Sequence, residues 1–448
     1  MKISTLQAIS PIDGRYWNKV KELANYFSEG ALIKYRVLVE IEYFIELCKL
    51  KLDKLSGFDR NHFVALRKIY TEFTSKDAKK IKKFEAQTNH DVKSVEYFVK
   101  SKFKKLGIGK YQEFIHFGLT SQDINNTAIP LSIRAAFEEV YLQDLNILIE
   151  ALESLAEDTR LTVMLARTHG QPASPTRLGK EIQVFITRLK NQTNLLLEIP
   201  HAAKFSGSTG NFNAHQLAYP EINWEKFARN FVQNNLGLVY SVPTTQIEHY
   251  DSFALLSDTL KRINTILIDF CRDIWGYISL DYFKLKINTA EVGSSAMPHK
   301  VNPIDFENAE GNLELANSLF AFFSRKLPIS RFQRDLTDST VLRNVGVPFA
   351  HTVIALKSIL NGIRKLEVNE SQINLDLDKN WQIISEAIQT LLRKEGYEKP
   401  YEQLKEFTRV SKAINKESIH LFIDSLNISD ALKSDLKKIT PFNYIGIS

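Results

Sequence analysis

The sequence predicts an all-α protein with a central bundle of long helices. Its 448 residues include 18 glycines and 13 prolines, which is below ordinary usage, while long stretches are rich in Leu, Ile, Lys, Glu, Ala and Phe. Apolar residues recur at steps of three and four through unusually long segments, a spacing that places them on one face of a helix. These segments span residues 131–162, 178–199, 251–283, 306–327 and 342–366.

Interruptions of this periodicity divide the chain into three predicted domains. A chain of this length exceeds what one hydrophobic core usually supports, so two or three domains are expected. Shorter helical patterns begin at Glu29 and stop at Gly107-Ile108-Gly109, and shorter patterns return after Glu367. We therefore predict an N-terminal helical domain at 1–112, the long-helix bundle at 113–365 and a small C-terminal helical domain at 366–448.

Charge and cysteine usage limit the classes of partner. The formal charge of +6 is small against 58 basic and 52 acidic residues, so it suits small anionic substrates as well as polyanions. Lysines at 76–110 alternate with aromatic residues at helical spacing, which indicates a solvated helix face, and we expect no nucleic-acid binding.

Cys48 and Cys271 lie in apolar helical patterns, which favours a reducing compartment without disulfides. Residues 1–15 lack a signal-like apolar core and no stretch is long enough to span a bilayer. We expect a cytoplasmic protein without membrane contact.

One loop carries more information than any other segment. It reads Gly293-Ser294-Ser295-Ala296-Met297-Pro298-His299-Lys300-Val301-Asn302-Pro303. It is not a Walker A loop, and no Gly-x-Gly-x-x-Gly fingerprint occurs in the chain, so nucleotide hydrolysis and dinucleotide redox chemistry lose their main support. A serine in a glycine-tethered loop near a lysine can act as a nucleophile or a base, and it can equally form an ordinary polar turn.

This loop resembles the signature of the fumarase, aspartase and argininosuccinate lyase superfamily, Gly-Ser-Ser-x-Met-Pro-x-Lys-x-Asn-Pro, at every fixed position. Two more segments match superfamily motifs in the same order: Thr120-Ser121-x-Asp123-Ile124-Asn125 and Arg167-Thr168-His169-Gly170-Gln171-Pro172-Ala173. Other segments narrow the resemblance to the adenylosuccinate lyase family, particularly its bacterial members. They are residues 10–16, 89–92, 244–248 and 334–344, and the resemblance extends to the closing stretch at 441–447.

The resemblance implies a three-domain, fumarase-like fold and an enzyme of purine biosynthesis. Its reaction would be the β-elimination of fumarate from adenylosuccinate, giving AMP, and from succinylaminoimidazole-carboxamide ribotide, giving AICAR, by general acid/base catalysis. No cofactor is implied, and no metal is expected because the chain lacks a His-x-x-x-His pair and ligand-spaced cysteines. The resemblance also implies a homotetramer in which three subunits contribute to each active site, and the long apolar helices suit such an interface.

Eliminating fumarate requires both a base and an acid. By motif match, the resemblance implies that Ser294 is the general base, with Ser295 as the competing candidate, and that His169 protonates the leaving nitrogen. A lone histidine is more often structural, but His169 lies in a loop rich in glycine and proline between two helices, where a core role is less natural. Negative charge develops on the substrate carboxylate during the reaction. Lys300 could supply a fixed cation there and Asn302 an amide donor.

Further residues match substrate-binding positions of the family. Thr120, Ser121 and Gln246 match positions that hold the succinyl group, although Thr120 and Ser121 can also be helix caps or turn residues. In Asn89-His90-Asp91, the matching family histidine sits at the active site, and Asp91 is near enough in sequence to orient or charge the imidazole of His90.

A nucleotide substrate also needs an anion site. Ser339 and Arg343 are four residues apart, on one face of a helix expected to begin near Thr337 or Asp338, whose N-terminus would attract phosphate. Arg334 could complete this cluster. The segment with Arg15 and Tyr16 matches a further phosphate-binding segment of the family, whereas the default interpretation of an isolated arginine is a surface ion pair.

Two rival functions remain open from the sequence. Another lyase of the superfamily, acting on argininosuccinate, aspartate or malate, would share the signature loop, but it gives no reason for Ser339 and Arg343 beside Arg334. Relatives of argininosuccinate lyase also serve as structural proteins of the lens. The presence of Ser294, His169 and Lys300 leaves that second rival unmotivated.

Overall fold

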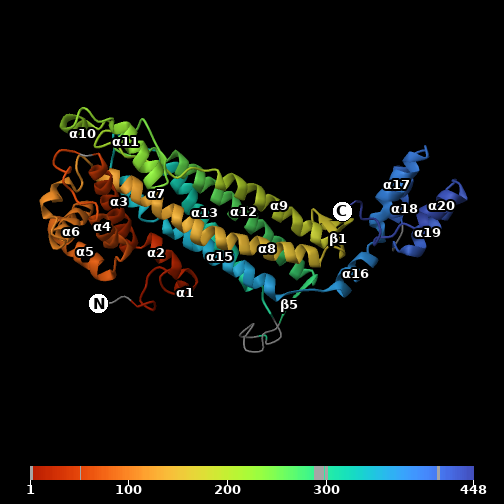
Figure 1. The fold of residues 1–448 in the computed structure, drawn as a ribbon. Coiled ribbons are helices and arrows are strands. Elements are labelled where there is room, and N and C mark those ends of the chain that lie inside the picture. Colours follow the sequence, from red (N-terminus) through yellow and green to blue (C-terminus); the bar gives the residue numbers. More distant parts are fainter. Residues whose placement is uncertain (1–3, 51, 287–296, 298–300, 411–413, 448) are drawn as a thin grey trace. The chain divides into compact units, whose positions relative to one another are not determined.

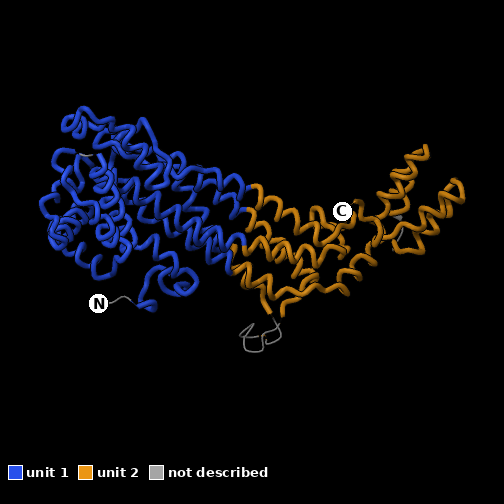
Figure 2. The backbone as a smooth tube through the Cα atoms, in the orientation of Figure 1, with its two compact units in different colours: residues 1–146, 192–265, 311–357 blue, residues 147–191, 266–310, 358–448 orange. Residues whose placement is uncertain are grey.

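A computed structural model describes residues 4–50, 52–286, 297, 301–410 and 414–447, and helices dominate it (Figure 1). The chain forms two compact units, each assembled from separate segments (Figure 2). Unit 1 comprises residues 1–146, 192–265 and 311–357, and unit 2 comprises residues 147–191, 266–310 and 358–448. The division into three consecutive domains stays a prediction. Within the described ranges, no helix combines the length and the apolar character needed to cross a bilayer.

The mostly helical fold predicted from the sequence is confirmed. The long helices are α8 (Leu142–Asp158), α9 (Leu178–Leu197), α12 (Asp251–Ser279), α13 (Ile304–Lys326) and α15 (Gly346–Lys365). In unit 1, Asn264 of α12 donates to Thr352 of α15 at 3.1 Å. In unit 2, the ring of Phe270 on α12 contacts Phe185 of α9 and Phe306 of α13. These contacts support the predicted side-by-side packing of long helices.

The helix expected to begin at Leu131 begins earlier. Helix α7 (Ser121–Ala136) contains Pro130 in its interior, and a π-helical turn, η3 (Phe137–Tyr141), joins it to α8. The start of α7 is fixed by Asp123. Its carboxylate accepts the backbone N–H of Thr120 at 2.8 Å, which is an N-terminal capping interaction. The first residues of the superfamily motif are therefore the first turn of a helix.

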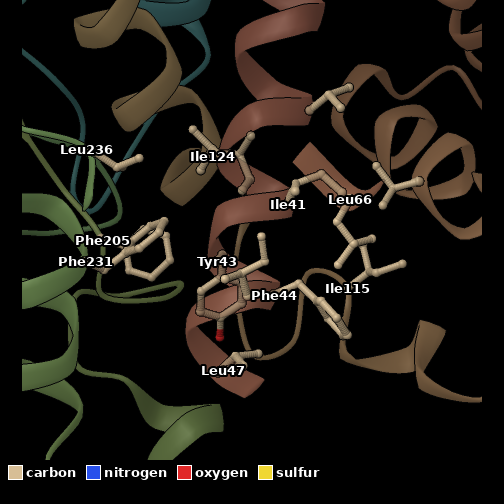
Figure 3. Packing of buried hydrophobic residues seen from close by; sticks show 14 of the residues in the cluster. Ile41, Tyr43, Phe44, Leu47, Leu66, Ile115, Ile124, Phe205, Phe231 and Leu236 are labelled. Carbon is tan, nitrogen blue, oxygen red and sulfur yellow. The ribbon is translucent and has the colours of Figure 1, made fainter. Parts of the chain in front are cut away.

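The remaining helices of unit 1 include α3, which is the longest of them. They are α1 (Trp17–Val20), η1 (Lys21–Leu23), α2 (Ala24–Phe27), α3 (Glu29–Lys49), α4 (His62–Thr71), α5 (Ser75–Thr88), α6 (Asp91–Lys105), η2 (Gly109–Phe114), α10 (Asn213–Ala218), α11 (Trp224–Asn230), η4 (Phe231–Asn235) and α14 (Thr337–Leu342). Figure 3 shows Tyr43 and Phe44 of α3 between Phe205 and Phe231 on one side and Ile115 on the other. The ring centroids of Tyr43 and Phe205 are 5.3 Å apart.

Helix α3 is buried on all sides along much of its length, including at Glu40, Glu42 and Glu46. Glu42 accepts hydrogen bonds from Arg67 and Tyr70, Glu40 lies 2.6 Å from His116, and Glu46 pairs with Lys49. A helix that is buried all round belongs to the interior of a domain. Its charged residues persist there because each has a partner.

Short strands complete both units. In unit 1, β3 (Ala202–Ala203) pairs in parallel with β4 (Val239–Tyr240). In unit 2, β1 (Val163–Thr168) and β2 (Gln171–Arg177) form an antiparallel hairpin, and β5 (Phe283–Leu285) pairs antiparallel with β6 (Leu366–Val368). The chain then forms α16 (Glu370–Asp378), η5 (Trp381–Ile384), α17 (Ser385–Lys394), α18 (Pro400–Val410), α19 (Lys416–Ser425) and α20 (Asp430–Lys437).

Candidate active site

Unit 1 contains a cavity of about 260 Å³ lined by residues of α2, α3, α7, α14 and the start of α15. Apolar residues such as Leu32, Ile129 and Leu342 form part of its wall. Five of its polar lining residues come from distant parts of the sequence: Glu29, Arg36, Asn125, Ser339 and Arg343. A concave surface that combines apolar walls with a few convergent polar groups is typical of a small-molecule site.

The predicted phosphate-binding residues lie together at this cavity. Helix α14 begins at Thr337, within the predicted range, and Arg343 is its C-cap residue. Ser339 and Arg343 both line the cavity. Arg334 Nη2 donates to Ser339 Oγ at 2.8 Å, so the third predicted residue joins the group. The Ser339 hydroxyl accepts this bond and keeps its own proton for donation to an anion.

Two carboxylates hold Arg343 in place. Its Nη1 donates to Glu29 Oε2 at 3.0 Å and its Nη2 to Asp91 Oδ2 at 3.1 Å. Burial would raise the pKa of Asp91, but the nearby Arg36 and Arg343 charges and a backbone hydrogen bond outweigh it and hold that pKa below its ordinary value. Asp91 therefore enters this group as a counter-charge to guanidinium groups.

The neighbouring residues Asn89 and His90 connect α5 to α6. Asn89 adopts a left-handed conformation with φ of 51° at the end of α5, which asparagine tolerates well. His90 is the N-cap of α6, and its Nδ1 accepts the backbone N–H of Lys93 at 3.1 Å. The same Nδ1 lies 4.0 Å from Asp91 Oδ1. The imidazole is half exposed and oriented by the backbone of α6.

The first turn of α7 is tied to the loop at 206–213 by a buried ion pair. Asp123 and Lys204 are both fully buried, and Lys204 Nζ lies 2.6 Å from Asp123 Oδ1. That oxygen also accepts the backbone N–H groups of Ser206 at 2.8 Å and Gly207 at 3.1 Å. Thr120 is the N-cap residue, in line with its alternative interpretation as a helix cap. The sequence motif includes Asp123, but nothing in it indicates Lys204 as the partner.

Gln246 belongs to a segment packed against the same loop. Its Nε2 donates to the backbone oxygen of Ser208 at 2.9 Å, and Thr244 Oγ1 lies 3.1 Å from Ser206 Oγ. Gly210 has φ of +79°, and a Cβ there would lie 2.0 Å from the Thr244 carbonyl oxygen. This approach of two backbones requires glycine. Gln246 is thus brought to the same part of unit 1 as the N-terminus of α7.

A buried hydrogen-bond network links three motif segments. Tyr250 Oη accepts from Asn126 Nδ2 at 2.9 Å and donates to Asp338 Oδ2 at 3.0 Å. Asn126 Oδ1 in turn accepts the backbone N–H of Glu248 at 2.9 Å. Burial raises the pKa of Tyr250 well above its ordinary value, so the phenol stays protonated and keeps its role as a donor. The network fixes α14 relative to α7, and the sequence motifs gave no indication of Tyr250.

The N-terminal candidates lie just before α1. Arg15 is exposed, while Tyr16 is partly buried and packs against the apolar cluster that contains Val20 and Leu23. Tyr26 and Phe27, which line the cavity, pack against the same cluster. Tyr16 therefore shares its packing with the cavity wall.

In unit 2, His169 occupies a different setting from the one predicted. The expected loop between two helices is the β1–β2 hairpin, in which Thr168 pairs with Gln171 and a two-residue turn remains. His169 and Gly170 have φ of 53° and 74°, as in the turns that match the twist of a tight hairpin. The imidazole of His169 is carried at the exposed tip of this hairpin.

Carboxylates of the C-terminal helices anchor the hairpin. Arg167 Nη2 donates to Asp376 Oδ2 at 2.7 Å, and Tyr282 Oη donates to the same oxygen. On the other side of the turn, Ser174 of β2 donates its hydroxyl proton to Glu386. Both strands that carry the His169 turn are therefore fixed by side chains distant in sequence.

The signature loop is described only in part. Ser294, Ser295 and Lys300 lie outside the described residues. Asn302 is described, partly buried and located just before α13. Across the described portion of the chain, no group of three or more His, Cys, Asp or Glu side chains is arranged to hold a metal ion.

Comparison with known protein families accounts for almost the whole chain. The family model described as Lyase matches residues 14–315. The model described as Adenylosuccinate lyase C-terminal matches residues 330–445. The two matches together include all three predicted motif regions of the central segment and the arginines of the cavity.

Individual relatives and solved structures agree with these matches. Adenylosuccinate lyase of Dictyostelium discoideum is 58% identical over 456 residues, covering 100% of this chain and 98% of that protein. Adenylosuccinate lyase of Escherichia coli (strain K12) is 47% identical over 448 residues, with the same coverage. Fumarate lyase from Mesorhizobium sp. BNC1 has a similar fold, with a TM-score of 0.75, 19% identity and 95% coverage of both chains. A 3-carboxy-cis,cis-muconate lactonizing enzyme from Pseudomonas putida has a TM-score of 0.73 and 17% identity, with 95% of this chain and 94% of that chain covered.

Proposed function

Because the chain belongs to the adenylosuccinate lyase family, we propose that it eliminates fumarate from adenylosuccinate and leaves AMP. We extend the proposal to succinylaminoimidazole-carboxamide ribotide, which carries the same succinyl and phosphate groups. The observation that carries the choice of nucleotide substrates is the grouping of Arg334, Ser339 and Arg343 at the unit 1 cavity. A substrate without phosphate gives no reason for two cations and a hydroxyl there.

The proposed reaction needs a base, an acid and a site for transient negative charge. The base removes a proton from the carbon beside a carboxylate, and the electron pair moves onto that carboxylate. The double bond of fumarate then forms as the neighbouring carbon–nitrogen bond breaks, and the acid protonates the nitrogen. We assign Ser294 as the base and His169 as the acid, with Lys300 and Asn302 facing the charged carboxylate.

The setting of His169 supports a role toward a ligand. The residue is exposed at a turn, and non-glycine residues with positive φ are uncommon outside turns and functional sites. Asp376 holds Arg167 on one strand of the hairpin, so the strand that leads into the His169 turn is anchored. A solvated imidazole on an anchored hairpin is accessible to a ligand, and an imidazole can donate or accept a proton.

We propose that the enzyme is a homotetramer with shared active sites. Its long helices expose large apolar side chains, which monomeric proteins rarely cluster on their surface. They include Leu195 and Leu197 of α9, Leu255 and Trp275 of α12, and Leu315 and Phe322 of α13, all at least 37% exposed. Light scattering should give four times the chain mass. Mixing inactive His169→Asn and Ser294→Ala proteins should restore activity if different chains supply the two residues to one site.

We also propose a cytoplasmic location. Both cysteines are free and buried, and burial raises the pKa of the Cys48 thiol to about 12. Burial also raises the pKa of the Cys271 thiol, so both thiols are poorly suited to thiolate chemistry. Fractionation of cells that express the protein would test the location.

The decisive test is an ultraviolet assay of the purified protein with adenylosuccinate, without added metal or nucleotide cofactor. Formation of AMP and fumarate in equal amounts is the expected result. Activity on argininosuccinate, aspartate or malate instead would keep the superfamily and reject the substrate. An intact tetramer that is inactive on all four compounds would favour a structural role.

A further inference from the structure

Arg36, a residue outside every motif of the sequence, lines the unit 1 cavity. It lies on α3, and its side chain is 3% exposed. Its Nε donates to Asn125 Oδ1 at 2.9 Å, and its Nη2 donates to Asp91 Oδ2 at 2.7 Å. Its Nη1 is buried and has no hydrogen-bond acceptor among the residues that the structure describes.

An unsatisfied N–H on a buried guanidinium is costly, because the group has lost its water and gained no partner. Native structures keep such groups rarely, and each one needs a reason. The surrounding turns of α3 are apolar, with Ile33 and Val37 buried beside Arg36. Asn125 and Asp91 account for Nε and Nη2 of Arg36, but not for a third nitrogen, Nη1, that is buried without an acceptor.

The charges around Arg36 favour an anion as the missing partner. Arg36 Nη2 and Arg343 Nη2 donate to the same oxygen, Asp91 Oδ2. Two guanidinium groups therefore lie beside one carboxylate at the cavity that Ser339 also lines. The remaining acidic neighbour, Glu29, pairs with Arg343. A phosphate can accept hydrogen bonds from several guanidinium groups at once. The fixed fork of arginine matches phosphate geometry better than the single ammonium group of lysine does.

We propose that Arg36 is a further phosphate-binding residue of the enzyme, with its Nη1 donating to a phosphate oxygen of the nucleotide held by Ser339 and Arg343. This inference rests on the proposed function. Asn125 and Asp91 act through Arg36: the first holds Nε, the second holds Nη2, and together they fix the plane of the guanidinium group. The planar geometry of the guanidinium group then determines the direction of both Nη1 protons.

The test compares product inhibition in wild type and Arg36→Lys. Lysine keeps the positive charge and can pair with Asp91, but it lacks the fork. The inhibition constant of AMP should rise about tenfold, equivalent to about 1.4 kcal/mol. Inhibition by inorganic phosphate should weaken in the same direction, while the inhibition constant of fumarate should stay within about twofold. The matched control is Arg67→Lys, at an arginine that pairs with Glu42 away from the cavity, which should leave all three constants unchanged.

Three outcomes would overturn the proposal. An unchanged inhibition constant of AMP in Arg36→Lys would show that Arg36 is a purely structural residue. Weaker inhibition by fumarate with unchanged inhibition by AMP would assign its Nη1 to the succinyl carboxylates. If Arg36→Lys does not fold, a crystal structure of the wild-type enzyme with AMP decides: a phosphate oxygen within hydrogen-bond distance of Nη1 supports the proposal, and its absence there rejects it. A wild-type protein that does not convert adenylosuccinate would instead reject the proposed function itself.

Discussion

Replacing Asp123 with asparagine should destabilise unit 1 more than any exposed acid-to-amide change. The carboxylate is fully buried and lies 2.6 Å from Lys204 Nζ, which is also fully buried. Its Oδ1 accepts two backbone N–H groups as well, from Ser206 and Gly207. The asparagine side chain has the same shape and can keep one acceptor in place. What it removes is the negative charge, and Lys204 is left buried without a counter-charge.

The expected loss follows from the burial of both partners. Removing one member of a buried ion pair costs about 3–5 kcal/mol, a large part of the 5–15 kcal/mol by which a domain is usually stable. Burial already lowers the pKa of Lys204 in the native protein, against the opposing effect of Asp123. In the variant, the folded state binds a proton at Lys204 less readily than the unfolded state. Stability should therefore rise with pH as Lys204 deprotonates in the folded state.

The assay is denaturant unfolding at fixed protein concentration, followed by circular dichroism at several pH values. Glu225→Gln is the matched control, because Glu225 pairs with Arg229 at 3.0 Å on the surface, with both side chains about half exposed. Exposed pairs of this kind contribute about 0–1 kcal/mol. Asp123→Asn combined with Lys204→Met should recover part of the loss. If Asp123→Asn unfolds at the same midpoint as the control, the buried pair does not stabilise the fold and the reasoning fails.

Three further predictions concern the site, and a fourth concerns the pH dependence of stability through His215, a buried residue of α10. Ser294→Ala should abolish turnover while the tetramer stays intact, because a loop hydroxyl adds little to a core; normal turnover there, with loss in Ser295→Ala, would move the base to Ser295. His169→Asn should lower kcat about 10²–10⁴-fold without changing the unfolding midpoint, since asparagine tolerates the positive φ of this turn; a lower midpoint would indicate a structural role. Arg343→Ala should raise the KM for adenylosuccinate about tenfold or more, and an unchanged KM would count against the anion site. Burial lowers the pKa of His215 from 6.5 to about 4, so the unfolded state takes up the proton first and stability falls as pH drops from about 6.5 to about 4, by up to about 3 kcal/mol. Unfolding measured at pH 7 and pH 5 should show a smaller loss in His215→Gln than in wild type.

The long helices could be predicted from the sequence because their apolar period persists over many turns. The predicted starts at Leu178 and Asp251 are those of α9 and α12. The β1–β2 hairpin could not be predicted in the same way. Pro172 and Pro175 lie in β2 and argue against a strand, and His-Gly is a less familiar turn pair than Asn-Gly. The turn is determined by Gly170 and by anchoring contacts that the local sequence does not reveal.

Helix α3 shows a second limit of local patterns. The apolar repeat of this segment predicts an amphipathic helix, in which charged residues such as Glu40, Glu42 and Glu46 are expected to face water. In the fold these glutamates are buried with partners such as His116 and Arg67. The partners come from other elements, so only the tertiary structure distinguishes a solvated face from a paired one.

The same reason explains which site residues the sequence could indicate. Ser339 and Arg343 are close in the chain, so their helical spacing predicts that they act together. Arg36 and Asn125 are 89 residues apart, Lys204 and Asp123 are 81 residues apart, and Tyr250 and Asp338 are 88 residues apart. No spacing rule connects residues at such separations. Motif resemblance indicates one member of some of these pairs, and packing is needed to find the other.

The two carboxylates at Arg343 have different roles when an anion enters the cavity. Glu29 is 41% exposed, and its pair with Arg343 is an exposed one that water and salt weaken. Asp91 is more buried and also holds the fully enclosed Arg36. An incoming phosphate can therefore replace Glu29 at Arg343 at little cost, while Asp91 keeps both guanidinium groups in position. Because the guanidinium groups are already fixed before binding, less conformational entropy is lost when the nucleotide binds. Asp91, although it is a carboxylate beside an anion site, is therefore the residue that pre-organises that site.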